Sequence, residues 1–102
     1  MQIKRGVKLR NLQPQMVFAA IIAHQVLEEE FKRELVITSG SEGKHSKNSL
    51  HYCGYAIDIR SNHLGDIFTD EVVKKLQEQL ADEYDVVKST NCIHIEYQPE
   101  TE

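Results

Sequence analysis

The fold of this 102-residue chain is decided by two alternating stretches, YAIDIR at Tyr55–Arg60 and CIHIEY at Cys92–Tyr97. Successive side chains of a β-strand point to opposite faces of its sheet. Each stretch therefore predicts a strand with one apolar face for the core, formed by Tyr55, Ile57, Ile59, Ile93, Ile95 and Tyr97. The opposite faces carry Ala56, Asp58 and Arg60 on the first strand, and Cys92, His94 and Glu96 on the second. If these two faces line one cleft, Asp58 and His94 meet there.

The residues before these strands predict a long helix, a short strand and a loop. Pro14 suits the first turn of a helix, and the apolar spacing predicts a helix over about residues 14–33. Its buried stripe would consist of Val17, Ala20, Ile21, His24, Leu27 and Phe31. Leu35–Thr38 predicts a strand, and the stretch over residues 40–50, rich in Gly, Ser, Lys and Asn, predicts a loop.

The remaining residues predict a second helix and a hairpin. Thr69 is a suitable N-cap for a helix that ends at about Asp82. Asp85–Lys88 predicts a strand joined to Cys92–Tyr97 by a tight turn. The order of elements predicts one α+β domain over residues 1–102, a small antiparallel sheet with helices packed on one face.

Composition narrows the classes of partner. The chain is 40% hydrophobic and 27% charged, with a formal net charge of -4, which disfavours nucleic acid as a partner. The dense basic patch, Lys4, Arg5, Lys8 and Arg10, is interpreted as a solvated segment. No apolar run approaches the length of a membrane span, and no secretory signal is recognised. A cytoplasmic protein without a membrane partner is therefore expected.

Three side chains form a candidate metal site. His51 lies seven residues before Asp58, so it can approach Asp58 and His94 from the loop that leads into the strand. Two imidazoles and one carboxylate are a ligand set typical of catalytic zinc, which keeps a fourth position open. Zinc in such a site polarises a carbonyl and lowers the pKa of its water, so no side-chain nucleophile is needed.

The other histidines and the two cysteines have simpler interpretations. His24 is expected to be buried and hydrogen-bonded, whereas His45 and His63 lie in loops. Cys92 is interpreted as a buried free thiol, although a thiolate there could also bind zinc and close the site. A disulfide between Cys53 and Cys92 is disfavoured in the cytoplasm.

The stretch Ser49–Asp58 fits the pattern S-x-H-x-x-G-x-A-x-D. It resembles the signature of the zinc D-alanyl-D-alanine carboxypeptidases and the phage L-alanyl-D-glutamate endolysins. The block His94–Pro99 looks like the last block of this family, and Thr38–Gly40 and Gly43–Ser46 are similar to its short phage and prophage members in particular. The resemblance covers about Val36 to Pro99. It implies the Hedgehog/DD-peptidase fold, a bound Zn²⁺, and His51, Asp58 and His94 as its ligands.

The chain departs from the family pattern at the position of the catalytic base. Relatives commonly have a carboxylate base three residues before the last histidine ligand, where this chain has Asn91, and an amide cannot accept that proton. Glu96 is an alternative base, although a hydrogen bond to a ligand is the simpler role. Lys44 or Arg60 is expected to hold the substrate carboxylate, and Ser49 to bond backbone or substrate at the edge of the site. A shifted alignment or an Asp-to-Asn substitution would also account for Asn91.

The resemblance implies a monomeric zinc metallopeptidase that hydrolyses peptidoglycan stem peptides, most similar to a phage endolysin. Such a protein would reach the cell wall through a holin or be carried in a virion. Asn91 leaves open an alternative, a zinc-binding relative or virion component that binds wall peptides without cutting them. A third possibility is a structural zinc domain closed by Cys92.

Overall fold

The computed structural model describes residues 1–7, 9, 12–40 and 55–98. Its five strands form one sheet in the order β1-β2-β3-β5-β4. The strands are β1 (Gln2–Ile3), β2 (Val36–Ser39), β3 (Ala56–Arg60), β4 (Tyr84–Lys88) and β5 (Cys92–Tyr97). β1 is parallel to β2, whereas the other neighbouring pairs are antiparallel. The sheet is therefore mixed, and the prediction of a purely antiparallel sheet is wrong at the β1 edge. A two-residue strand is too short to produce an alternating pattern.

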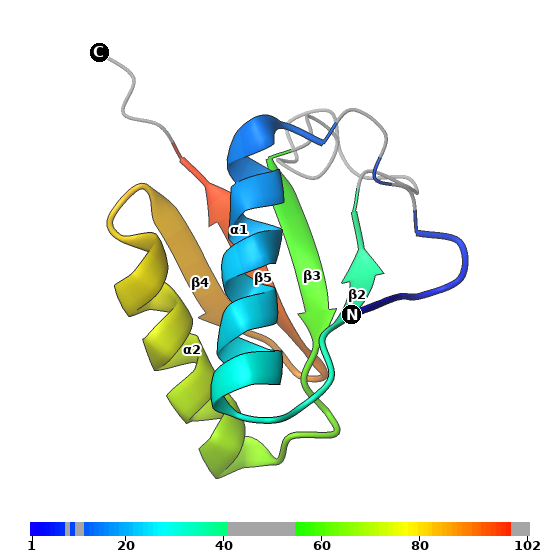
Figure 1. The fold of residues 1–102 in the computed structure, drawn as a ribbon, viewed down its shortest axis with the longest axis vertical. Coiled ribbons are helices and arrows are strands. Elements are labelled where there is room, and N and C mark those ends of the chain that lie inside the picture. Colours follow the sequence, from blue (N-terminus) through cyan, green and yellow to red (C-terminus); the bar gives the residue numbers. More distant parts are fainter. Residues whose placement is uncertain (8, 10–11, 41–54, 99–102) are drawn as a thin grey trace.

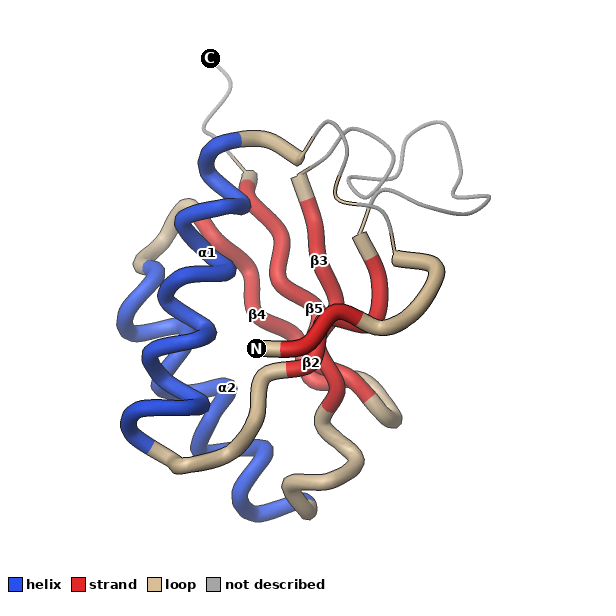
Figure 2. Tube along the Cα trace, turned by 45° about the vertical axis from the view of Figure 1, so that its right-hand side comes forward, coloured by secondary structure: helices blue, strands red, loops and turns tan. Residues whose placement is uncertain are grey.

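Two helical segments cover one face of this sheet. Helix α1 (Pro14–His24) continues directly into the π-helical turn η1 (Gln25–Glu30), and α2 is Asp66–Leu80. In Figures 1 and 2 both helices lie on the same side of the strands, and no helix of the described residues lies on the other side. The α+β class and the one-sided helical layer are confirmed. None of the helices in the described ranges is long and apolar enough to cross a membrane.

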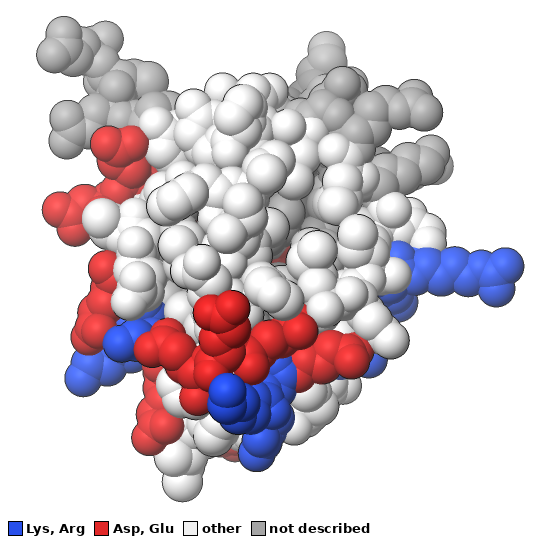
Figure 3. Space-filling view, in the orientation of Figure 1, with Lys and Arg blue, Asp and Glu red and all other residues white. Residues whose placement is uncertain are grey.

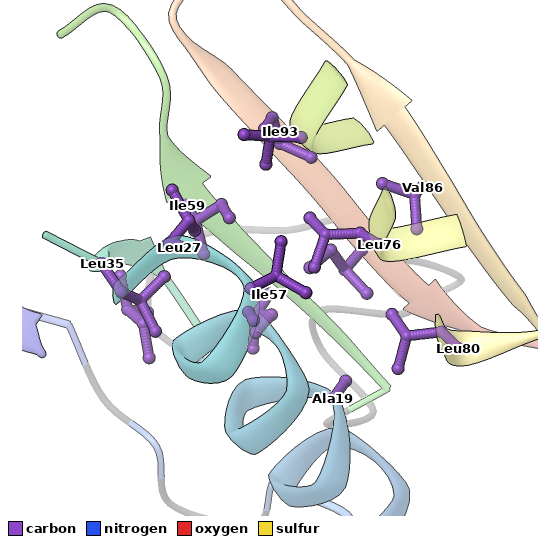
Figure 4. Packing of buried hydrophobic residues seen from close by; sticks show 14 of the residues in the cluster. Ala19, Leu27, Leu35, Ile57, Ile59, Leu76, Leu80, Val86 and Ile93 are labelled. Carbon is purple, nitrogen blue, oxygen red and sulfur yellow. The ribbon is translucent and has the colours of Figure 1, made fainter. Parts of the chain in front are cut away.

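The core lies between the helices and the sheet, as the alternation of β3 and β5 predicts. Ile57, Ile59, Ile93 and Ile95 are completely buried. They pack with helix residues that include Ala19, Leu27, Leu76 and Leu80 (Figure 4). Burying a large aliphatic side chain is worth roughly 1.5–3 kcal/mol. This apolar layer fixes which face of β3 and β5 turns away from the helices.

The predicted buried stripe of the first helix is wrong for several residues. Met16, Ala19, Ala23, Val26 and Leu27 are buried, whereas Val17 and Ile21 are about half exposed. His24 is partly exposed rather than buried. Almost every residue from Met16 to Ala23 is apolar, so the spacing does not single out one face.

Helix α2 begins three residues before the predicted cap. Its N-cap residue is Gly65, with φ +79°, and Thr69 lies inside the helix. The Thr69 hydroxyl donates to the Gly65 carbonyl at 2.6 Å. Threonine can bond a backbone carbonyl four residues earlier, so its presence alone does not mark a helix start.

Candidate metal centre

The candidate site lies on the face of the sheet that the helices leave open. β3 and β5 are neighbouring antiparallel strands, and their register places Asp58 directly opposite His94. Across the other edge of β5, His94 faces Val87 of β4. The buried isoleucines on either side of Asp58 and His94 turn both side chains to the open face. The predicted meeting of Asp58 and His94 is therefore present.

The imidazole of His94 lies between two carboxylates. Its Nδ1 is 2.7 Å from Asp58 Oδ1, and its Nε2 is 2.8 Å from Glu96 Oε1. The Gln98 side-chain amide in turn donates to the second oxygen of Glu96. The side chains of Asp58 and His94 are 22% and 26% exposed, so both are held by protein yet reachable from solvent.

The two carboxylates set the protonation of this ring. The hydrogen bond to Asp58 is the main reason that the pKa of His94 is raised above its usual value. Burial opposes this shift, and Glu96 adds to it. Both contacts favour the protonated ring, because an imidazolium can donate at each nitrogen.

The donor atoms fit part of a zinc site. A carboxylate oxygen and an imidazole nitrogen converge at Asp58 and His94, and both are ordinary zinc ligands. Glu96 on the other nitrogen is the kind of partner that orients a ligand histidine. The third predicted ligand, His51, lies outside the described residues. Within the described ranges, no group of three or more His, Cys, Asp or Glu side chains is arranged to hold a metal ion.

Asn91, the predicted position of the base, lies three residues before His94. It is exposed in the turn that precedes β5, and its backbone carbonyl accepts a hydrogen bond from the Ser61 N–H. An odd spacing of three residues from His94 favours the opposite side of the strand. Whether a carboxylate at this position would act as a base stays a prediction, to be tested by substitution.

Cys92 lies on the open face two residues before His94. Its thiol is free and half-buried, opposite Arg60 of β3. Burial and the nearby charge of Asp58 raise its pKa, which favours the neutral thiol. The free thiol was expected, although the residue is less buried than predicted. Cys53 lies outside the described residues.

The substrate-binding residues predicted from sequence are only partly described. Arg60 follows Asp58 by two residues and is half-buried on the same strand. Lys44 and Ser49 lie outside the described residues, as does His45. His63 is engaged elsewhere: its Nε2 lies 3.2 Å from the Glu34 carbonyl oxygen.

Sequence reasoning missed two residues of this face. Gln98 holds Glu96, and the Thr38 hydroxyl donates to the Asp58 carbonyl at 3.4 Å. The two-residue spacing that singles out His94 and Glu96 extends to Gln98. That spacing is a signal for Gln98, whereas the contact of Thr38 depends on the pairing of β2 with β3.

Comparison of the chain with known proteins found no relative. A scan against protein-family models, a search of curated proteins and a search of solved structures each found no match.

Proposed function

We propose that this chain is a zinc-dependent peptidase of the Hedgehog/DD-peptidase fold that hydrolyses peptidoglycan stem peptides. The observation that carries the proposal is the 2.7 Å approach of His94 Nδ1 to Asp58 Oδ1 on the open face of the sheet. The motif around Ser49–Asp58 supplies His51 as the third ligand. A phage or prophage endolysin is the closest functional type.

Each described residue has a distinct part in this proposal. Zinc bound by His51, Asp58 and His94 would act as a Lewis acid on a peptide carbonyl and lower the pKa of a water. Glu96 fixes the orientation of His94 through Nε2, and Gln98 fixes Glu96. Since Glu96 is held by these two contacts, it acts as a positioning residue rather than as the base.

Arg60 is the proposed anchor for the substrate's carboxylate. It lies two residues beyond Asp58 on β3, which corresponds to roughly 7 Å along a strand. Stem peptides carry free carboxylates, and a guanidinium binds a carboxylate through two parallel hydrogen bonds. Arg60→Lys should therefore raise KM for a wall peptide more than it changes kcat.

The test measures zinc content and peptide hydrolysis together. The wild-type chain should bind one zinc ion and release fragments from purified wall peptides, and His94→Ala or Asp58→Asn should lose both properties. His63→Ala is the matched control, because His63 is exposed and its imidazole contacts the backbone carbonyl of Glu34. Hydrolysis that survives removal of the metal by a chelator would refute the proposal.

A second candidate is a zinc-binding module that recognises wall peptides without cutting them. The exposed turn position of Asn91, without a carboxylate, favours it. The discriminating variant is Asn91→Asp. If the variant gains hydrolysis at unchanged zinc content, the natural chain binds without turnover. If the wild type already turns over well, position 91 is not where the base lies.

A further inference from the structure

Strand β4 lies at an edge of the sheet, beside helix α2 (Figure 1). Within the described residues it pairs with β5 and with no other strand. The Ser89 N–H donates to the Cys92 carbonyl, and the Gln98 N–H donates to the Glu83 carbonyl. In an antiparallel pair, successive residues turn their main-chain groups alternately to the partner strand and to the opposite edge. Because residues 83 and 89 bond the β5 side, residues 84, 86 and 88 turn their main-chain groups to the outer edge.

The side chain of Gln77, on α2, bonds two of these outward-facing residues. Its Oε1 accepts the Val86 N–H at 3.1 Å, and its Nε2 donates to the Tyr84 carbonyl at 2.7 Å. The same Nε2 lies 3.0 Å from the Ala81 carbonyl, which accepts the Tyr84 N–H at 3.3 Å. A side-chain amide has the same kinds of donor and acceptor as a peptide unit. Gln77 therefore bonds the edge of β4 as the backbone of a neighbouring strand would.

The other features of β4 do not close this edge. Its sequence, YDVVK, has two valines and a tyrosine, which favour strands, and no proline. The Lys88 ammonium lies 3.0 Å from Asp70 of α2, so it is directed at the helix. Side chains of both charges gather on the side of the molecule where α2 lies (Figure 3), and Asp85 and Lys88 leave β4 without net charge. A strand edge of this kind is a template for pairing with another chain unless it is covered.

We propose that Gln77 is a substitute strand partner, which closes the outer edge of β4 to pairing with a second copy of the chain. Two copies joined antiparallel about a two-fold axis at Val86 would bond the Val86 N–H of each copy to the Val86 carbonyl of the other. The same axis would place Tyr84 opposite Lys88 of the second copy. Gln77 already holds the Val86 N–H and the Tyr84 carbonyl, so both copies would have to break these bonds before pairing.

This proposal is independent of the proposed peptidase activity, because it concerns the edge of the sheet and needs no metal. It gives a structural reason for a chain that stays monomeric. A role of Gln77 in stability alone makes a different prediction. Loss of the side chain would then lower the free energy of unfolding and leave self-association of the folded chain unchanged.

Sedimentation equilibrium of the full chain from about 1 μM to 1 mM, the range of moderate to weak affinities, tests the proposal. The wild type should keep the mass of a monomer, whereas Gln77→Ala should form dimers in this range. Each freed group that finds a partner is worth roughly two- to tenfold in affinity, so association should strengthen at least about tenfold. Gln79→Ala is the matched control, because Gln79 is exposed on the same helix. Circular dichroism checks that each variant folds, and Gln77→Met, which keeps the length and helix propensity of glutamine, takes the place of Gln77→Ala if alanine unfolds the chain.

A second substitution shows whether the dimer uses this edge. Lys88→Pro breaks no bond to β5, because the Lys88 N–H points outward, but it removes a donor that edge pairing needs. Added to Gln77→Ala it should restore the monomer, whereas Lys88→Ala, which keeps the N–H, should leave the dimer. A folded Gln77→Ala that stays monomeric over the whole range would overturn the proposal, as would a dimer that Lys88→Pro leaves intact. A wild type that dimerises as strongly as Gln77→Ala would also overturn it.

Discussion

At the scale of single residues, the open face depends on one histidine whose two nitrogens are both engaged by carboxylates. Alternation along β3 and β5 predicted that Asp58 and His94 would meet, because buried isoleucines fix the opposite face. The same alternation put Glu96 beside them, but only the atomic contacts assign it to Nε2 of His94. No sequence pattern reveals which nitrogen of a histidine faces which partner.

Glu96→Gln should weaken zinc binding by roughly 10- to 100-fold if Glu96 positions His94. An amide is a poorer acceptor for the Nε2 proton and leaves the ligand less well oriented. The affinity can be measured by competition with a chelator. Asp85→Asn is the matched control, since Asp85 is the exposed cross-strand neighbour of Glu96 on β4. Unchanged zinc affinity with lost hydrolysis would instead identify Glu96 as the base.

Glu28 ties three parts of the chain together near the start of β2. Its Oε2 is 2.8 Å from the Met1 ammonium, accepts the Leu35 N–H at 3.0 Å and lies 3.4 Å from His24 Nδ1. The hydrogen bond from the ammonium is the main reason that the pKa of Glu28 is lowered from its usual 4.5, followed by the bond from Leu35.

Acid should therefore weaken the fold partly through Glu28. Because its folded pKa is lowered, its contribution is present above the unfolded pKa of 4.5 and is lost as the pH falls through the folded pKa. Glu28→Gln should show a smaller loss of unfolding free energy than the wild type between about pH 6 and 3 in urea titrations. Glu29→Gln, an exposed neighbour, should follow the wild-type profile; identical profiles for all three chains would contradict the assignment.

At the scale of elements, α2 is bounded at both ends by residues with positive φ. Gly65 precedes it with φ +79° and ψ 161°, and Ala81 follows it with φ +67° and ψ -167°. A side chain in this region costs on the order of 1–3 kcal/mol. A Cβ at Gly65 would meet no atom within 4 Å, so the cost there is backbone strain alone.

Substitutions at the two ends of α2 should change the free energy of unfolding in opposite directions. Gly65→Ala should lower the free energy of unfolding by about 1–3 kcal/mol. Ala81→Gly should raise it by up to about 1 kcal/mol, since relief of strain is partly offset by the entropy of glycine in the unfolded chain. Urea titrations of both variants measure the two changes. A destabilised Ala81→Gly would show that the residue is not strained.

The bounds of the elements were predicted most closely where a strand has one polar face. β5 begins and ends as predicted, and β3 differs by one residue, since both strands alternate strictly. α1 is apolar nearly all round, so its buried side depends on the shape of the sheet beneath it. The start of α2 at Asp66 was missed because its N-cap residue, Gly65, is no stronger a start signal than Thr69.

At the scale of the whole molecule, one apolar layer supports both the helices and the candidate site. Leu76 is fully buried in that layer, on the helical side of the sheet. Leu76→Ala should cost about 2–5 kcal/mol of unfolding free energy while zinc affinity in the folded state is unchanged. Ile67→Ala, at a mostly exposed position, should cost little. Denaturant titration measures the stability of each variant, and zinc competition on the same samples measures its zinc affinity. A large loss of zinc affinity in folded Leu76→Ala would show that the apolar layer and the candidate metal centre are coupled.

The pairing of β3 with β5 has a kinetic consequence. Asp58 and His94 are 36 residues apart, and β5 lies between β3 and its own hairpin partner β4. The local β4–β5 hairpin can form early, whereas docking of β3 must close a long loop first. A metal that needs both side chains would find them together only after that docking, so it should slow unfolding and leave the folding rate unchanged. Stopped-flow folding and unfolding with and without zinc measure the two rates, and faster folding with zinc would mean that the two strands meet before the rest of the sheet.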